Sequence, residues 1–388
     1  MDRIAQRMFG LGTETAFEVL ARAKGLEARG RDIIHLEIGE PDFDTPANVV
    51  DAGVKALREG WTHYGPSAGQ MIAREAIAEN FSAERGVQVG PENVVITPGA
   101  KPILFYSVLA LVNPGDEVIY PDPGFPIYES VISFFGAKPV PLPLREDRQF
   151  TFDLADLEAR VTDRTRMVIV NSPHNPCGSM LSRGMLEQIA ELAERRDFWV
   201  LADEIYSRIT YEEPHESITQ FPGMLDRTIV VDGFSKTYAM TGWRLGYGIV
   251  PRDVEPHISR LMTNSNSCTA SFTQVAGIEA LRGPQDDVDA MVAEFRRRRD
   301  RMVEGLNAIE GISCVKPKGA FYVFPNVKEL GLRSVELQDR LLEEAGVASL
   351  AGTSFGPEGE GYLRFSYANS LENIEKALGL IGNLLQKV

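Results

Sequence analysis

The sequence predicts an α/β protein, a three-layer sandwich with a mostly parallel central sheet, joined to a smaller α+β domain. Three observations support this prediction. Short apolar runs alternate with amphipathic segments, and Gly, Pro or Asn stands between them. Residues 166–203 form one clear strand–loop–helix–strand unit. Beyond residue 285, a long charged segment precedes two further strand-like runs, which indicates a second unit.

The clearest unit begins with an expected strand at 166–171 (RMVIVN) and a loop, SPHNPCGSM. The next segment, SRGMLEQIAELAERR, places its apolar residues on one helical face, and Ser182 is the expected N-cap. FWVLADE is the following strand. Other strands are expected at NVVIT (93–97), DEVIYPDP (116–123) and RTIVVDGF (227–234).

Three segments are predicted along the chain. Residues 1–45 hold an amphipathic helix and a strand, and are expected to join the smaller domain. Residues 46–284 form the large domain. Residues 285–388 form the small α+β domain, with a charged helix at 286–310 and strands within GAFYVFPNV and GYLRFSYAN.

The composition narrows the possible functions. The chain has 388 residues, 44% of them hydrophobic, and a net charge of −15, which argues against nucleic-acid or anionic-membrane partners. The N-terminus lacks the apolar core of a signal peptide. The longest apolar run, Ile103 to Val112, is too short to span a bilayer. Three widely spaced cysteines indicate free thiols in a reducing compartment, so a cytoplasmic location is expected.

Distinctive residues follow the carboxyl ends of five expected strands. Ligands of open parallel sheets bind outside those ends, so these residues should converge on one cleft. They are Thr97 to Lys101, Phe125 and Tyr128, Asn171 and Asn175, Asp203 and Tyr206, and Ser235 and Lys236.

These residue types fit the parts of one molecule, pyridoxal phosphate. Gly99 and Ala100 stand where a helix begins, so backbone N–H groups there would meet the phosphate. Ser235 and Arg244 would complete that cradle, and Phe125 offers a flat face to the ring.

The remaining groups suit the ring and its aldehyde. Asp203 ends an apolar run, where a cationic ring nitrogen would neutralise its carboxylate. Asn175 and Tyr206 would hydrogen-bond the ring oxygen. Lys236 would form the Schiff base, with a pKa lowered by desolvation and by Arg244.

The chain resembles the fold-type I pyridoxal-phosphate enzymes of the aspartate aminotransferase family, class I/II. The resemblance covers nearly the whole length. Its motifs are EIGEPDFDTP, HYGPSAGQMIAREAIA, TPGAK, NSPHNPCG, ADEIYS, SKTYAMTGWRLGY, GAFYVF and YLRFSYAN.

The resemblance implies a role for each motif residue. Lys236 resembles the lysine that forms the aldimine and carries the proton, Asp203 the partner of the ring nitrogen, and Asn175 and Tyr206 the ring-oxygen contacts. Arg364, helped by Gly39 and Asn175, resembles the clamp on the substrate α-carboxylate. The phosphate-binding positions implied by the resemblance are Gly99, Ala100, Lys101, Ser235 and Arg244, together with Tyr64, which would reach the neighbouring subunit's phosphate in a homodimer.

Four residues depart from the family's usual pattern. Pro102 removes one N–H donor, Cys177 stands where threonine is common, His174 occupies a variable position, and Phe125 replaces a tyrosine or tryptophan. None of these changes removes an essential chemical group.

Several other functions are disfavoured. GTSFG (352–356) matches G-x-S-x-G, but PEGEG follows it in place of the helix that a serine hydrolase requires. No G-x-G-x-x-G follows a strand, and the five histidines lack metal-ligand spacing, so no metal is expected. The leading hypothesis is a ping-pong aminotransferase acting on an L-amino acid and a 2-oxo acid. A C–S or β-elimination lyase is the alternative, and a non-catalytic cofactor-binding regulator is a weaker one.

The substrate side chain stays open at this point. Lys101 is a candidate for the second carboxylate of a dicarboxylic substrate, or for the phosphate region. Alternatively, an apolar or aromatic pocket would be shaped by Phe17, Phe355, Tyr322 and His174. The N-terminal helix, with Glu14 and Thr15, is expected to close over the site by resemblance.

Overall fold

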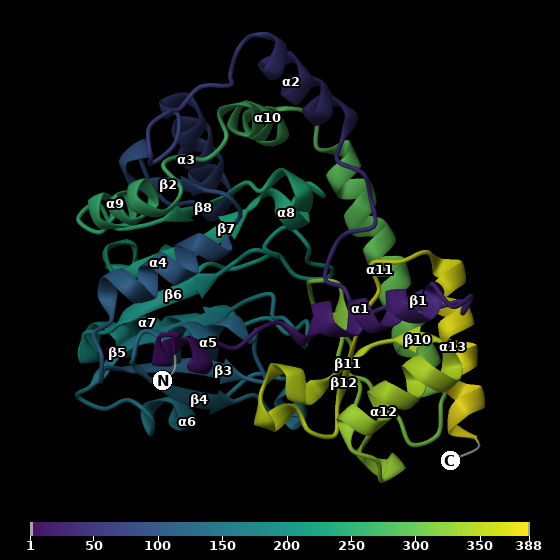
Figure 1. Ribbon diagram of the computed structural model, residues 1–388. Helices are drawn as coiled ribbons and strands as arrows, with labels where there is room; N and C mark the ends of the chain where they lie inside the picture. The colour runs from purple at the N-terminus through teal and green to yellow at the C-terminus, as the bar shows by residue number, and fades with distance from the viewer. Residues whose placement is uncertain (1–2, 387–388) are drawn as a thin grey trace.

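A seven-stranded sheet forms the centre of the computed structural model, which describes residues 3–386 (Figure 1). Within this sheet β8 alone runs antiparallel to its neighbours, and the other adjacent pairs are parallel. The prediction of a mostly parallel α/β sheet is confirmed. In spatial order the strands are β2 (Val94–Thr97), β8 (Gly246–Ile249), β7 (Thr228–Gly233), β6 (Trp199–Asp203), β5 (Thr165–Asn171), β3 (Glu117–Asp122) and β4 (Lys138–Pro143).

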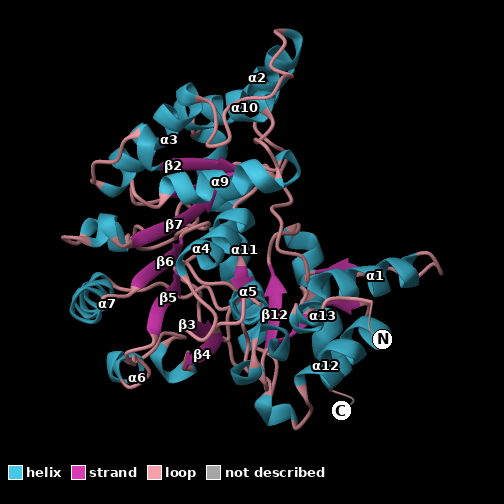
Figure 2. Ribbon diagram, turned by 60° about the vertical axis from the view of Figure 1, so that its left-hand side comes forward, coloured by secondary structure: helices cyan, strands magenta, loops and turns pink. Residues whose placement is uncertain are grey.

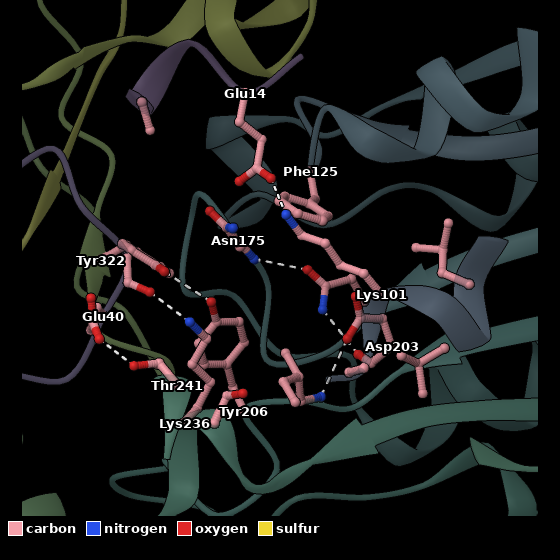
Figure 3. A pocket seen from close by; sticks show the side chains of 18 of the residues that line it. Glu14, Glu40, Lys101, Phe125, Asn175, Asp203, Tyr206, Lys236, Thr241 and Tyr322 are labelled. Carbon is pink, nitrogen blue, oxygen red and sulfur yellow. Dashed lines mark hydrogen bonds and ion pairs between the residues drawn. The ribbon is translucent and has the colours of Figure 1, made fainter. Parts of the chain in front are cut away.

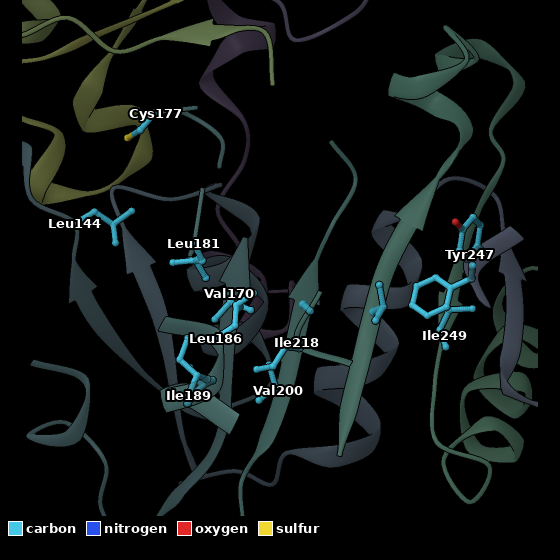
Figure 4. Close-up of a cluster of buried hydrophobic side chains, with 14 of the residues drawn as sticks. Leu144, Val170, Cys177, Leu181, Leu186, Ile189, Val200, Ile218, Tyr247 and Ile249 are labelled. Atoms are coloured by element: carbon cyan, nitrogen blue, oxygen red, sulfur yellow. The ribbon is translucent and has the colours of Figure 1, made fainter. Parts of the chain in front are cut away.

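Helices cover both faces of this sheet because successive strand residues point to opposite sides. In β5, Val168 and Val170 belong to one buried cluster, whereas Met167 and Ile169 belong to another. Figure 4 shows the first cluster, in which Val170 and Val200 lie near Leu186 and Ile189. Helices α3 (Met71–Arg85), α7 (Arg183–Arg196) and α10 (Ser271–Arg282) contribute to the first cluster, and α4 (Lys101–Leu111), α5 (Ile127–Phe134) and α9 (Glu255–Ser265) to the second.

The expected helix after the first loop has the predicted start. The Ser182 hydroxyl accepts a hydrogen bond from the Met185 amide at 3.3 Å, so Ser182 is the N-cap of α7. The helix ends at Arg196, and Asp197 adopts a left-handed φ of 54° before β6 begins. This sharp reversal brings β6 alongside β5.

A second group of elements packs beside the sheet around its own buried cluster (Figure 2). An antiparallel sheet orders β11 (Leu350–Ala351), β12 (Leu363–Ser366) and β9 (Tyr322–Val323), so the strand predicted within GAFYVFPNV is shorter than expected. From the N-terminal part of the chain, β1 (Ile34–His35) pairs in parallel with β10 (Val347–Ala348). The helices of this region are α1 (Thr15–Glu27), α11 (Asp286–Asn307), α12 (Ser334–Arg340), the π-helical turn η8 (Leu341–Ala345) and α13 (Leu371–Leu385).

The domain limits after residues 45 and 284 stay predictions, and the pairing of β1 with β10 is consistent with them. No helix between residues 3 and 386 combines the length and the apolar character needed to cross a bilayer. The remaining helices are α2 (Ala47–Arg58), α6 (Leu154–Glu158), α8 (Phe234–Thr237), and the short helices η1 (Gln6–Gly10), η2 (Pro91–Asn93), η3 (Glu146–Arg148), η4 (Ile218–Gln220), η5 (Met224–Asp226), η6 (Thr241–Trp243), η7 (Lys328–Leu330), η9 (Gly352–Phe355) and η10 (Pro357–Gly359).

Candidate active site

A cavity of about 340 Å³ lies at the carboxyl ends of the parallel strands (Figure 3). The large sheet, the C-terminal elements and the N-terminal segment all contribute to its wall. Every site residue predicted from the sequence lines it except Gly99 and Tyr64. Those lining it are Gly39, Ala100, Lys101, Phe125, Asn175, Asp203, Tyr206, Ser235, Lys236, Arg244 and Arg364.

Lys236 lies in α8, directly after the buried strand β7, and its side chain lines the cavity (Figure 3). Its Nζ donates a hydrogen bond to the Gly39 carbonyl at 2.6 Å. Burial lowers the pKa of Lys236 to about 8, and the charges of Lys101 and Arg364 act in the same direction. Arg244 was expected to lower the pKa of Lys236, but it is not among the causes of the shift. Arg244 is exposed and donates from Nη1 to the Thr241 carbonyl at 2.7 Å.

Asp203 ends β6 and is 7% exposed. Its Oδ2 accepts a hydrogen bond from the Tyr128 hydroxyl at 2.7 Å, and its Oδ1 accepts one from the Ile205 amide at 3.3 Å. Burial raises the pKa of Asp203 to about 6, although these two hydrogen bonds act against the rise. Among residues 3–386, no basic side chain forms an ion pair with this carboxylate. The site therefore holds a buried acid that lacks a cationic partner.

Arg364 extends from β12 toward the cavity and is 4% exposed. Its guanidinium lies 4.5 Å from the ring centre of Tyr322 and 4.9 Å from that of Phe355. Nη1 donates to the Asn175 Oδ1 at 3.2 Å, Nη2 donates to the Glu37 carbonyl, and Nε has no partner within the described chain. Burial lowers the pKa of Arg364 below its ordinary value. An arginine with an unused donor at a cavity wall is suited to bind an anion.

Near Gly39, the Arg364 Nη2 donates to the Glu37 carbonyl, and the help of Gly39 in binding the α-carboxylate stays a prediction. Gly39 accepts from Lys236 and lies against Tyr322, whose hydroxyl oxygen would be 2.2 Å from an added Cβ. The Tyr322 hydroxyl in turn hydrogen-bonds the Tyr206 hydroxyl at 2.8 Å. Because Gly39 has no side chain, the Tyr322 hydroxyl can lie beside it and reach the Tyr206 hydroxyl.

Of the residues predicted to bind phosphate within this chain, all but Gly99 line the cavity. Gly99 has a φ of +85°, and a Cβ there would lie 2.3 Å from the Arg244 Nη2. Ala100 is the N-cap of α4, whose first residue, Lys101, has an amide without a helical partner; Pro102 has no amide hydrogen, and the Ile103 amide bonds the Ala100 carbonyl at 3.1 Å. Ser235 and Arg244 line the same cavity. This combination of a helix N-terminus, a hydroxyl and a guanidinium is suited to an anion.

Two charged contacts at the site were not anticipated. Glu14, just before α1, forms an ion pair with Lys101. Glu40 accepts a hydrogen bond from the Thr241 hydroxyl. The N-terminal helix with Glu14 was expected over the site, but neither pairing was predictable, because each joins segments that are remote along the chain.

Tyr128, which was expected in the cleft without an assigned role, contacts the predicted acid. It is fully buried, but its hydroxyl bonds Asp203, and its ring contacts Phe125 edge-on at 5.6 Å. The signal that placed it in the cleft is its position, like that of Phe125, after the expected strand at 116–123.

Two expected residues lie away from the cavity. Tyr64 is 90% exposed. His174 does not line the cavity, so the structure does not support its part in a substrate pocket. It is buried, neither ring nitrogen has a partner among the described residues, and burial lowers its pKa to about 3. Phe17 and Tyr322 line the cavity. Phe355 does not line it, but its ring packs against the guanidinium of Arg364, which does.

The chain matches a known protein family over most of its length. Residues 31–381 match the family described as aminotransferase class I and II. The aspartate aminotransferase of Pyrococcus horikoshii is 41% identical over 99% of this chain and 97% of its own. The aromatic-amino-acid aminotransferase 2 of Thermococcus litoralis is 39% identical over 94% of each chain.

A solved structure leads to the same family. The aspartate aminotransferase from Thermus thermophilus with maleate superimposes with a TM-score of 0.94 at 37% identity, covering 99% of this chain and 100% of that chain. None of these three relatives carries a lyase name, so the lyase alternative gains no support from them. From the match over residues 31–381 and these near full-length similarities, the chain belongs to the aminotransferase class I and II family.

Proposed function

We propose that this aminotransferase binds pyridoxal phosphate in the cavity and moves an amino group between an L-amino acid and a 2-oxo acid by a ping-pong mechanism. The observation that carries the proposal is the joint placement of Lys236, Asp203 and Arg364 on one cavity. An amine with a lowered pKa, a buried acid and a free guanidinium donor meet there.

The residues present fit the cofactor. Asp203 has no cationic partner among the described residues, and a pyridinium nitrogen would supply one. The close approach of the Arg244 guanidinium to Gly99, which a Cβ would prevent, suits the phosphate together with Ser235 and the N-terminus of α4. Asn175 and Tyr206 would face the ring oxygen, and Phe125 the ring.

Pyridoxal phosphate supplies an aldehyde that captures amines and a ring that accepts electrons from the substrate α-carbon. The chain's own residues do the rest. Lys236, whose pKa is about 8, is neutral in about a tenth of molecules at pH 7, and would take the proton from the α-carbon and return it to the carbon on the other side of the transferred nitrogen. Arg364 binds the α-carboxylate and orients that carbon. Asp203 keeps the ring nitrogen protonated.

A turnover assay tests this proposal against the lyase alternative. The protein, loaded with pyridoxal phosphate, is mixed with each amino acid in turn, with and without a 2-oxo acid. We expect a new amino acid to form only when the acceptor is present, with parallel lines in double-reciprocal plots. Release of ammonia and a 2-oxo acid without any acceptor would support the lyase instead.

Replacing Arg364 with lysine should raise the KM for amino acids by about 10²-fold while changing kcat much less. Lysine keeps the charge but lacks the planar pair of donors that matches a carboxylate. Steady-state kinetics with an amino acid and with its decarboxylated amine provide the measurement. The amine lacks the α-carboxylate, so its kinetics should respond little to the substitution, and an equal loss for both would assign Arg364 a structural role.

The proposal includes a homodimer, in which Tyr64 reaches the partner's phosphate site. Tyr64 is 90% exposed, and α2 presents Val50, Val54 and Leu57 to solvent at helical spacing. Figure 1 shows α2 at the edge of the molecule, where a second copy has access to it. Sedimentation should give twice the chain mass of 42.9 kDa. Replacing Val54 with aspartate should shift the equilibrium toward the monomer; an unchanged dimer would place the interface elsewhere.

A cytoplasmic location stays a prediction.

A further inference from the structure

We propose that Glu14 is a specificity-determining residue that occupies Lys101 and thereby disfavours amino acids with a second carboxylate. The enzyme would then prefer substrates with uncharged side chains. This inference rests on the proposed function, because it concerns the part of the cavity that receives the substrate side chain.

The Glu14–Lys101 pair is built from two distant segments. Glu14 precedes α1, and Lys101 is the first residue of α4. Although Glu14 occupies the N-cap position of α1, its carboxylate makes no capping hydrogen bond and reaches Lys101 instead. The Lys101 Nζ also lies 5.4 Å from the ring centre of Phe125. Figure 3 shows the two side chains meeting beside that ring.

Glu14 and Lys101 line the same cavity as the two groups that would hold the amino acid. Burial dominates the lowered pKa values of Lys236 and Arg364, and the charge of Glu14 acts against the lowering at both residues. Glu14 is therefore close enough to influence both groups that would hold the amino acid. Its side chain is 20% exposed, so the solvent only partly screens its charge.

The cavity that holds the pair also has apolar lining residues. Phe17, Ile38 and Leu104 line the cavity together with Phe125. An uncharged side chain can contact these groups while the ion pair stays intact. A side-chain carboxylate would have to displace Glu14 from Lys101, exchanging one ion pair for another and leaving a second negative charge nearby, so it gains little affinity.

Calorimetric titration of the full chain loaded with pyridoxal phosphate tests this inference without turnover. The probes are succinate and butyrate, which have the same carbon chain and differ in the second carboxylate. For the wild type we expect the two Kd values to agree within about threefold. In Glu14→Gln the Kd of succinate should fall about tenfold, since Lys101 becomes available for a charge-assisted hydrogen bond, while that of butyrate stays the same.

Two further variants isolate the cause. Glu40→Gln removes the same charge from the same cavity, but Glu40 bonds Thr241 and not Lys101, so its effect on succinate should be much smaller. In the double variant Glu14→Gln/Lys101→Met, the gain for succinate should disappear. The proposal is overturned if the wild type strongly prefers succinate, if Glu40→Gln matches Glu14→Gln, or if the gain survives without Lys101. Since the readout is a Kd, its failure is distinguishable from a failure of amino transfer.

Discussion

Lys236→Ala should lower kcat/KM for transamination by more than about 10⁴-fold, the largest loss expected for any single substitution in this chain. The substitution removes both the amine that would capture the aldehyde and the base that would move the α-proton. Alanine also removes the hydrogen bond to the Gly39 carbonyl, but that carbonyl belongs to the half-buried Gly39 at the cavity, so folding should be preserved.

Borohydride reduction with peptide mass analysis provides a direct readout beside kinetics. In the wild type the pyridoxyl mass should appear on the peptide that contains Lys236, and in Lys236→Ala it should be absent. Lys55→Ala is the control, since it removes an exposed lysine outside the cavity and should leave the label on Lys236. A label that persists in Lys236→Ala would contradict the proposed site.

Asp203→Asn should lower kcat by about 10³-fold and, at the same time, stabilise the cofactor-free protein. Asparagine can still accept the Tyr128 hydrogen bond but cannot neutralise a cationic ring nitrogen. For the cofactor-free chain the sign follows from the pKa, which is about 6 in the folded protein and 3.8 ordinarily. The folded protein binds more protons than the unfolded chain between these values, so stability falls as the pH rises through that window.

The cost of keeping Asp203 ionised is fully present above pH 6 and amounts to about 3 kcal/mol. Asparagine does not ionise, so urea unfolding at pH 7 should show the variant to be more stable by up to this amount, with a smaller gain at pH 5. Glu204→Gln is a useful contrast. Glu204 is also buried, but the charges of His215 and Arg85 outweigh the effect of burial and lower its pKa to about 2, so its replacement should destabilise the protein. A cofactor-free Asp203→Asn protein no more stable than the wild type would mean that the carboxylate is compensated by another group.

The fold and the composition of the cavity were accessible from the sequence because both depend on local patterns. Strands β5 and β6 are short apolar runs followed by turn residues, and parallel strands bring their carboxyl ends to one edge. This rule predicts from the sequence alone that Asn175, Asp203 and Lys236 lie near one another, and all three line the cavity. The assignment of their roles depended on the resemblance and stays a prediction.

Contacts between remote segments could not be predicted in this way. The Tyr128 hydroxyl was not expected to bond Asp203, because nothing in the local sequence distinguishes a buried tyrosine in the core from one beside a site. Likewise, the Arg364 bond to the Glu37 carbonyl depends on how the N-terminal segment passes over β12. Such pairings are decided by tertiary packing, which no periodicity encodes.

Residues 234–245 connect β7 to β8. These strands form an antiparallel pair in which Gly233 is opposite Gly246, and the connection between them carries both Lys236 and Arg244. The chain length of this connection therefore sets the span from the amine to the anion cradle. A single-residue insertion or deletion there would put the two out of step even if every side chain were retained, so this stretch should tolerate changes of residue far better than changes of length.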